Sequence, residues 1–276
     1  LEGTKLVRFA EVPGMVEAAA SGSLEPVLEV IEGRGIDGLL VARGEGKGAL
    51  GELMSGVASP PLRAVLLDSK FTYYEVEPLL ELEEVHRLAL ARAARQILGG
   101  STRPPIGYFP EPLRQVRSVE VMVMLRDRGQ PRLWRSARAG SIASALVMAA
   151  EAARERWSER ADALGGALSK VLPRLDVEVS LLVEDGTFLD RRPVFLASSL
   201  TEDHGVGYEQ AGKWRYLLPS RIREFGEGGR ERAFPLLFEE NSLPPNAQER
   251  SDVRLYRLRV HPLATSPASK AARLDP

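Results

Sequence analysis

The first 80 residues combine short apolar runs with one helical repeat. Residues 5–12, 36–42 and 62–67 have the length and apolar content of strands, and a short helix is predicted at 49–58 before Pro60-Pro61. Another helix is predicted after Ser23, which would cap its N-terminus. Its apolar positions recur at i, i+3, i+4 and i+7, and they are Leu24, Val27, Leu28 and Ile31. This alternation predicts a small α/β segment.

A longer amphipathic helix is predicted at residues 81–98. Its apolar face would consist of Leu82, Val85, Ala89, Ala93 and Ile97. Gly99-Gly100 would end the helix, and the proline-rich residues 101–115 are predicted to form a loop. We place a domain boundary near residue 80, just before this helix.

Two hairpins are predicted in the remainder of the chain. Apolar residues alternate over 119–125, Asp127-Arg128-Gly129 is typical of a turn, and 132–138 would form the returning strand. The second hairpin would consist of 205–210 and 214–218, joined at 211–213. Trp214 and Tyr216 would share a face, where they would pack as core or present an aromatic edge to a partner.

The other elements follow from capping and periodicity. Ser141 is placed to cap an Ala-rich helix that reaches Trp157, and a second helix would run to about Leu172. The remaining predictions are an alternating strand at 177–183, short helices over 219–241, a closing strand at 253–260 and a linker-like tail at 262–276.

Composition excludes several classes of protein. The chain has no Cys, so disulfides, thiolate nucleophiles and Cys-ligated metals are excluded. The net charge of −1 gives no global field for nucleic acid or membranes, and no apolar run is long enough to span a bilayer. Charges among residues 1–20 argue against a signal peptide, and the initial Leu suggests a processed protein or a piece of a longer one. The compartment stays open.

Several strings between residues 82 and 261 resemble the AMMECR domain family. They are Asp176–Ser180, His204–Gly207, Lys213–Ser220, Leu243–Ala247 and Val253–Leu258. The resemblance implies an α+β fold with a mixed or antiparallel sheet and flanking helices at 81–261, preceded by the α/β segment at 1–80. The family signature Leu-Arg-Gly-Cys-Ile-Gly is not retained, because residues 132–138 match only its Leu. The resemblance therefore implies a fold and very little chemistry.

A glycine-rich loop is one candidate cofactor site. Gly46, Gly48 and Gly51 follow a predicted strand and open a predicted helix, and the next strand ends at Asp68. This order would allow a dinucleotide pyrophosphate to approach the helix and an acid to meet the ribose. The alternative is an ordinary turn between strand and helix. A P-loop is excluded because Lys47 is followed by Gly rather than Ser or Thr.

Histidine chemistry is a second candidate. The three histidines, His86, His204 and His261, are too scattered for a metal motif. Asp203-His204 could act with Ser141 or Ser144, but neither serine lies in a nucleophile elbow. The alternative is that Asp203 and His204 are polar residues of a surface or loop.

An Arg-rich hairpin is the third candidate. Residues 114–138 contain seven arginines but only two carboxylates, Glu120 and Asp127. The arginines are Arg114, Arg117, Arg126, Arg128, Arg132, Arg135 and Arg138, and Trp134 lies among them. The guanidinium groups could bind phosphates, and the aromatic ring could stack on bases. However, alternation along the strands sends the arginine side chains to both faces of the sheet, which favours a hairpin that is solvated or contacts another protein.

The leading hypothesis is a non-catalytic module that binds another protein or another domain of the same polypeptide. It predicts no cofactor, no metal and no membrane span. One alternative is nucleic-acid binding through Arg126, Arg132, Trp134 and Arg135. The other is a nucleotide-binding enzyme that uses the loop from Gly46 to Gly51, so the question of catalysis stays open.

Overall fold

The computed structural model describes residues 11–34, 36, 38–42, 62–76, 82–116 and 118–268. Its contacts group the chain into two compact units. Unit 1 comprises residues 1–79 and 184–258, and unit 2 comprises residues 80–183 and 259–276. The predicted boundary near residue 80 thus falls where the chain first passes between the units. Independent folding of residues 1–80 and 81–261 stays a prediction.

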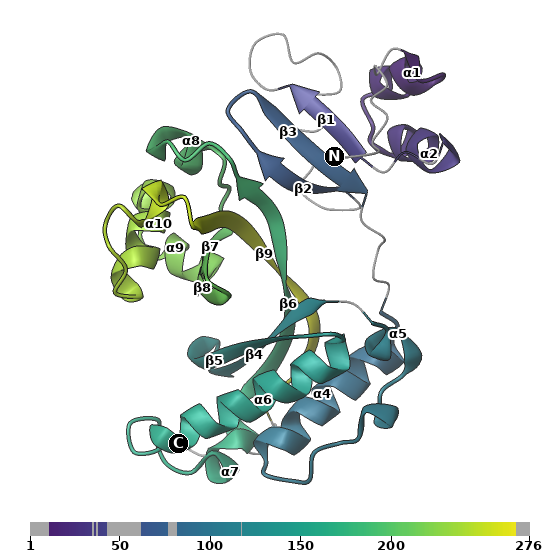
Figure 1. Cartoon of the computed structure of the whole chain (residues 1–276). Coiled ribbons are helices and arrows are strands. Elements are labelled where there is room, and N and C mark those ends of the chain that lie inside the picture. The colour runs from purple at the N-terminus through teal and green to yellow at the C-terminus, as the bar shows by residue number, and fades with distance from the viewer. Residues whose placement is uncertain are drawn as a thin grey trace. The chain divides into compact units, whose positions relative to one another are not determined.

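The N-terminal part of unit 1 is a three-stranded antiparallel sheet with two helices beside it (Figure 1). Its elements are α1 (Met15–Ala20), α2 (Glu25–Arg34), β1 (Gly38–Ala42), β2 (Leu62–Leu67) and β3 (Phe71–Val76). Strand β3 pairs with both β1 and β2. Leu39 and Val41 pack with Val27 and Ile31 of α2 in one apolar cluster.

The rest of unit 1 is formed by residues 184–258. Its elements are the last part of β6 (Asp176–Phe188), α8 (Pro193–Ser198), β7 (Gly205–Gln210), β8 (Lys213–Leu217), α9 (Pro219–Arg223), α10 (Gly229–Glu240) and the first part of β9 (Val253–Ser266). The strands that enter this unit are ordered β1-β3-β2-β6-β9-β7-β8. Phe188, Tyr208, Phe234, Phe238 and Leu255 form the centre of its core.

Unit 2 is a sheet with helices α4 and α6 packed together on one face (Figure 1). Its elements are α4 (Glu84–Leu98), α5 (Glu111–Arg114), β4 (Val119–Asp127), β5 (Gln130–Ala139), α6 (Ile142–Glu159), α7 (Leu168–Val171) and the first part of β6. Strand β4 lies between β5 and β6, antiparallel to both. Every second residue of β4, including Val121 and Val123, points into the helix-covered core, as alternation predicts.

Local signals are confirmed at several elements. Both hairpins form, and Ser141 caps α6 by accepting a hydrogen bond from the Ser144 N–H at 3.2 Å. Ser23 likewise accepts from the Glu25 N–H at 3.4 Å at the start of α2. The fold is α+β, as the sequence and the resemblance implied.

Other expectations about elements were wrong. Residues 71–76 form the unpredicted strand β3, and β9 continues to Ser266, so the first five residues of the predicted tail are strand. The second helix contains only Leu168–Val171 before a 3-10 turn. Val85 is 55% exposed instead of facing the core. Its neighbour His86 is buried instead, and its Nδ1 accepts from the Glu83 N–H at 3.0 Å in the cap of α4.

Candidate functional site

The predicted nucleotide loop lies largely outside the described residues, since Gly46, Gly48 and Gly51 are not among them. Asp68 is described, and its Oδ1 accepts from the Lys70 N–H at 2.8 Å within the turn from β2 to β3. Strand β3 lies between β1 and β2. A dinucleotide fold would instead place the two strands around its loop side by side, so this topology does not favour the hypothesis, which stays a prediction.

His204 lies in the loop before β7, which agrees with one part of the alternative, but its side chain belongs to a buried network rather than to the surface. Its side chain is 1% exposed, and its Nε2 lies 2.7 Å from Asp185 Oδ2. Its Nδ1 accepts from the Thr201 N–H at 2.9 Å, which places the proton on Nε2. Asp203 points elsewhere: it is 79% exposed and lies 3.8 Å from Arg223.

The network continues from Asp185 to Arg257. Arg257 Nε donates to the Asp185 backbone carbonyl at 2.7 Å and lies 3.2 Å from its carboxylate, while Nη1 donates to Ser199 at 2.9 Å. The carboxylate therefore has both a histidine and a guanidinium partner, as a buried charge requires. Both ring nitrogens of His204 are also used, so the network holds β6, β9 and residues 199–204 together and offers no open acid–base pair.

The Arg-rich hairpin is partly neutralised by carboxylates. Four of its seven guanidiniums form ion pairs: Arg114 with Glu111 of α5 at 2.6 Å, Arg126 with Glu178 at 2.8 Å, Arg132 with Asp127 at 3.1 Å and Arg138 with Glu120 at 3.3 Å. Two of these partners come from the hairpin itself, and Glu178 comes from β6. The pairs weaken the attraction that such a surface would have for phosphates.

Trp134 and Arg135 occupy successive positions of β5 and therefore face opposite sides of the hairpin. The Arg135 guanidinium donates to the Trp134 carbonyl at 2.9 Å. Burial, together with the nearby Arg156, lowers the pKa of Arg135. Of the four residues predicted to contact nucleic acid, Arg126 and Arg132 are thus ion-paired, and Trp134 and Arg135 lie on opposite faces of the hairpin. Their role in binding stays a prediction.

A cluster across β8, β7 and β9 contains Trp214 and Tyr216, which the sequence predicted to share a face, together with residues that the sequence did not single out. The strand register places two rows on one face of the sheet: Trp214, Glu209 and Arg254 form one row, and Tyr216, Gly207 and Tyr256 form the other. The Tyr256 ring lies in edge contact with Trp214 and Tyr216, at centroid distances of 5.6 and 6.2 Å. We call these two rows, together with Glu184, the aromatic–arginine face.

Gly207 makes this arrangement possible. A Cβ atom at this position would lie 2.1 Å from the Tyr256 ring, so any side chain would displace the tyrosine. A glycine in a strand interior marks such a close approach.

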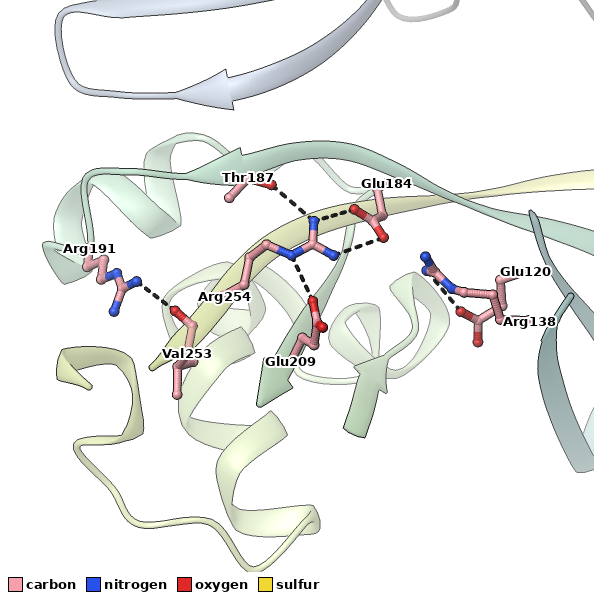
Figure 2. Close-up of polar contacts among 8 residues, drawn as sticks. All are labelled: Glu120, Arg138, Glu184, Thr187, Arg191, Glu209, Val253 and Arg254. Atoms are coloured by element: carbon pink, nitrogen blue, oxygen red, sulfur yellow. Dashed lines mark hydrogen bonds and ion pairs between the residues drawn. The ribbon is translucent and has the colours of Figure 1, made fainter. Parts of the chain in front are cut away.

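Arg254 is held between the carboxylates of Glu184 and Glu209 (Figure 2), and it also packs against two aromatic rings. Its Nη1 donates to Glu184 at 2.6 Å and its Nε donates to Glu209 at 2.9 Å. Its guanidinium carbon lies 4.8 Å from the Trp214 ring centre and 5.0 Å from that of Tyr256. Burial acts to lower the pKa of Arg254, but the hydrogen bonds and charges of the two glutamates outweigh it and raise the pKa.

The same cluster adjoins a sheet edge. Among the described strands, β8 pairs with β7 alone, so one of its edges has no strand partner there. Arg254, Glu184 and Glu209 keep 34%, 23% and 24% of their side chains exposed. The arrangement can therefore offer an accessible guanidinium, half-buried aromatic rings and backbone hydrogen-bonding groups to a partner.

The described residues contain no group of three or more His, Asp or Glu side chains that could hold a metal ion. No helix in that part of the chain is long and apolar enough to cross a membrane.

The fold defines the chain as an α+β protein. No protein-family model matches the sequence, and no curated protein matches it either. The crystal structure of the uncharacterized protein PH0010 from Pyrococcus horikoshii is similar, with a TM-score of 0.51 and 18% sequence identity. The similarity covers 66% of this chain and 92% of the other, and at this identity it establishes the fold alone.

Proposed function

We propose that this chain is a non-catalytic binding module that engages another polypeptide through the aromatic–arginine face. The observation that carries the proposal is the fixed position of Arg254 between Trp214 and Tyr256. Tryptophan, tyrosine and arginine are the residues that most often dominate binding energy at protein interfaces. The glutamates hold the arginine in one conformation, so binding would freeze little additional side-chain motion.

The proposed occupant is an extended segment of the partner that adds a strand to the open edge of β8. Strand addition uses backbone hydrogen bonds for affinity and side-chain contacts on one face for specificity. Here Trp214 and Tyr216 supply that face, because both lie on β8 with their rings toward Tyr256. An apolar side chain of the partner would pack against them.

The buried histidine network supports the absence of catalysis. A general base must reach a substrate proton, whereas His204 is 1% exposed and already bonded at both ring nitrogens. We also propose that residues 82–261 adopt an AMMECR-like fold. The matched strings and the fold similarity to the Pyrococcus horikoshii protein support this, and neither assigns a reaction.

The test uses a library of displayed 12-residue peptides selected against the intact chain. Selected peptides should bind the Trp214→Ala variant at least about thirtyfold more weakly, because a hot-spot residue contributes about 2 kcal/mol. Trp134→Ala is the matched control, since Trp134 is also a half-buried strand tryptophan but lies in unit 2. Binding should also slow hydrogen exchange of the amides at 213–217.

Three results would contradict the proposal. Peptides that bind Trp214→Ala as tightly as the unaltered chain would exclude the aromatic–arginine face. Protection that omits residues 213–217 would exclude strand addition to β8. Turnover of a simple substrate by the intact chain would exclude the non-catalytic reading.

A further inference from the structure

The turn between β7 and β8 determines which backbone groups of β8 point toward the open edge of the sheet. Its two central residues, Ala211 and Gly212, both have positive φ, as in a type I′ hairpin turn. In such a turn the two flanking residues, here Gln210 and Lys213, exchange backbone hydrogen bonds. Hydrogen-bonded and non-hydrogen-bonded pairs then alternate along the two strands.

Trp214 and Tyr216 direct their backbone groups toward that edge. They lie opposite Glu209 and Gly207, which are the first and third pairs beyond the bonded pair at the turn. These are non-hydrogen-bonded positions of the hairpin, so the N–H and C=O groups of both aromatic residues point away from β7. A strand added at the edge would hydrogen-bond to these two residues, and its side chains at those positions would lie on the aromatic–arginine face.

The opposite side of β8 is cationic. Lys213 and Arg215 alternate with the two aromatic residues and therefore point to the other side of the sheet. Lys213 is exposed, Arg215 is half-buried, and neither forms an ion pair with a carboxylate of the described residues. Their neighbours across β7 are Gln210 and Tyr208, which carry no negative charge. The edge strand thus carries two cations on one face, two positions apart.

These cations distinguish between the possible occupants of the edge. A second copy of β8 would bring its own Lys213 and Arg215 to the facing positions, and like charges on neighbouring strands destabilise their pairing. Charged residues on an edge strand prevent its pairing with a copy of itself in this way. Carboxylates at the facing positions would instead form cross-strand ion pairs, so charge complementarity favours an acidic partner.

Building on the function proposed above, we propose that the partner segment is an extended strand in which apolar and acidic residues alternate. Its apolar side chains lie beside Trp214 and Tyr216, and its Asp or Glu side chains lie beside Lys213 and Arg215. Because side chains alternate between the two sides of a strand, one segment can satisfy both faces of β8 at once. The cations thereby add a requirement for acidic residues to the apolar contact with the rings.

The experiment measures the binding of three synthetic nine-residue peptides to the intact chain by isothermal titration calorimetry. Each peptide alternates valine with one polar residue, which is glutamate, glutamine or lysine. We expect the glutamate peptide to bind about fivefold more tightly than the glutamine peptide, because two cross-strand ion pairs are added. The lysine peptide should bind more weakly than either, and Trp214→Ala should weaken the binding of all three.

Charge reversal tests the role of the two cations. In the double variant Lys213→Glu and Arg215→Glu, the lysine peptide should bind most tightly and the glutamate peptide least tightly. Loss of folding would not produce such a change of preference. The matched control is the double variant Arg92→Glu and Arg103→Glu, which makes the same change of charge at two exposed arginines of unit 2 and should keep the preference for glutamate.

The possible results separate the acidic partner from the function on which it rests. Equal binding of the three peptides, or a preference that charge reversal leaves unchanged or that the control variant also reverses, would overturn the acidic partner. The proposed function would stand in those cases if Trp214→Ala still weakens binding. If none of the three peptides binds but the display-selected peptides require Trp214, the acidic partner is likewise overturned and the function stands. If no peptide of either set requires Trp214, both are overturned.

Discussion

Gly207→Ala should destabilise the protein by displacing a buried ring. The added methyl carbon would lie 2.1 Å from one Tyr256 ring atom and 2.2 Å from another, and Tyr256 is fully buried. The ring cannot easily turn away because Trp214 and Tyr216 flank it. Overpacking of this kind costs about 1–3 kcal/mol, and the short distances place the expected loss toward the upper end.

The assay is chemical denaturation of single and double variants. Tyr256→Leu will destabilise the protein by itself, but it removes the ring atoms that the new methyl group meets. Gly207→Ala should therefore cost much less in the Tyr256→Leu background, with a coupling energy of at least about 1 kcal/mol. The single Gly207→Ala variant should also melt about 2–4 °C lower for each kcal/mol lost. An equal cost in both backgrounds would refute the reasoning, because it would show that the close contact with Tyr256 is not the cause.

Two further predictions concern charged groups. His204→Ala should lower the free energy of unfolding by at least about 2 kcal/mol, because it removes a hydrogen bond to the buried Asp185. The control Asp203→Ala changes an exposed residue and should alter the free energy of unfolding by less than about 0.5 kcal/mol. Equal losses for the two variants in chemical denaturation would contradict this prediction. Hydrogen bonds from Arg250, then from Gln210, lower the pKa of Asp252 to about 2. Its small contribution to stability is thus present above its ordinary pKa and is lost as pH falls from about 4 to about 2. A carboxyl NMR titration should show this midpoint and its return toward the ordinary range in Arg250→Gln; an unchanged midpoint would refute the role of Arg250.

Local structure was largely determined by the sequence. Both hairpins were predicted from alternation and turn residues, and the turns contain Arg128, Gly129, Ala211 and Gly212 with positive φ. The cap at Ser141 was likewise readable, because it depends on a hydroxyl and an amide three residues apart. Such features depend on neighbours in sequence, so one chain is enough to predict them.

The contacts of the candidate sites were decided only by the tertiary structure. Glu184 and Arg254 are 70 residues apart, and Asp185 and His204 are 19 apart. Strand pairing brings Glu184 and Arg254 together, and the loop before β7 brings His204 to Asp185; both depend on how whole strands align rather than on a local motif. For the same reason, Asp203-His204 looked like a pair in sequence, although in the fold the histidine turns inward and the aspartate lies in solvent. Adjacent positions along the chain face different surroundings, whereas distant ones meet when burying apolar surface brings their strands together.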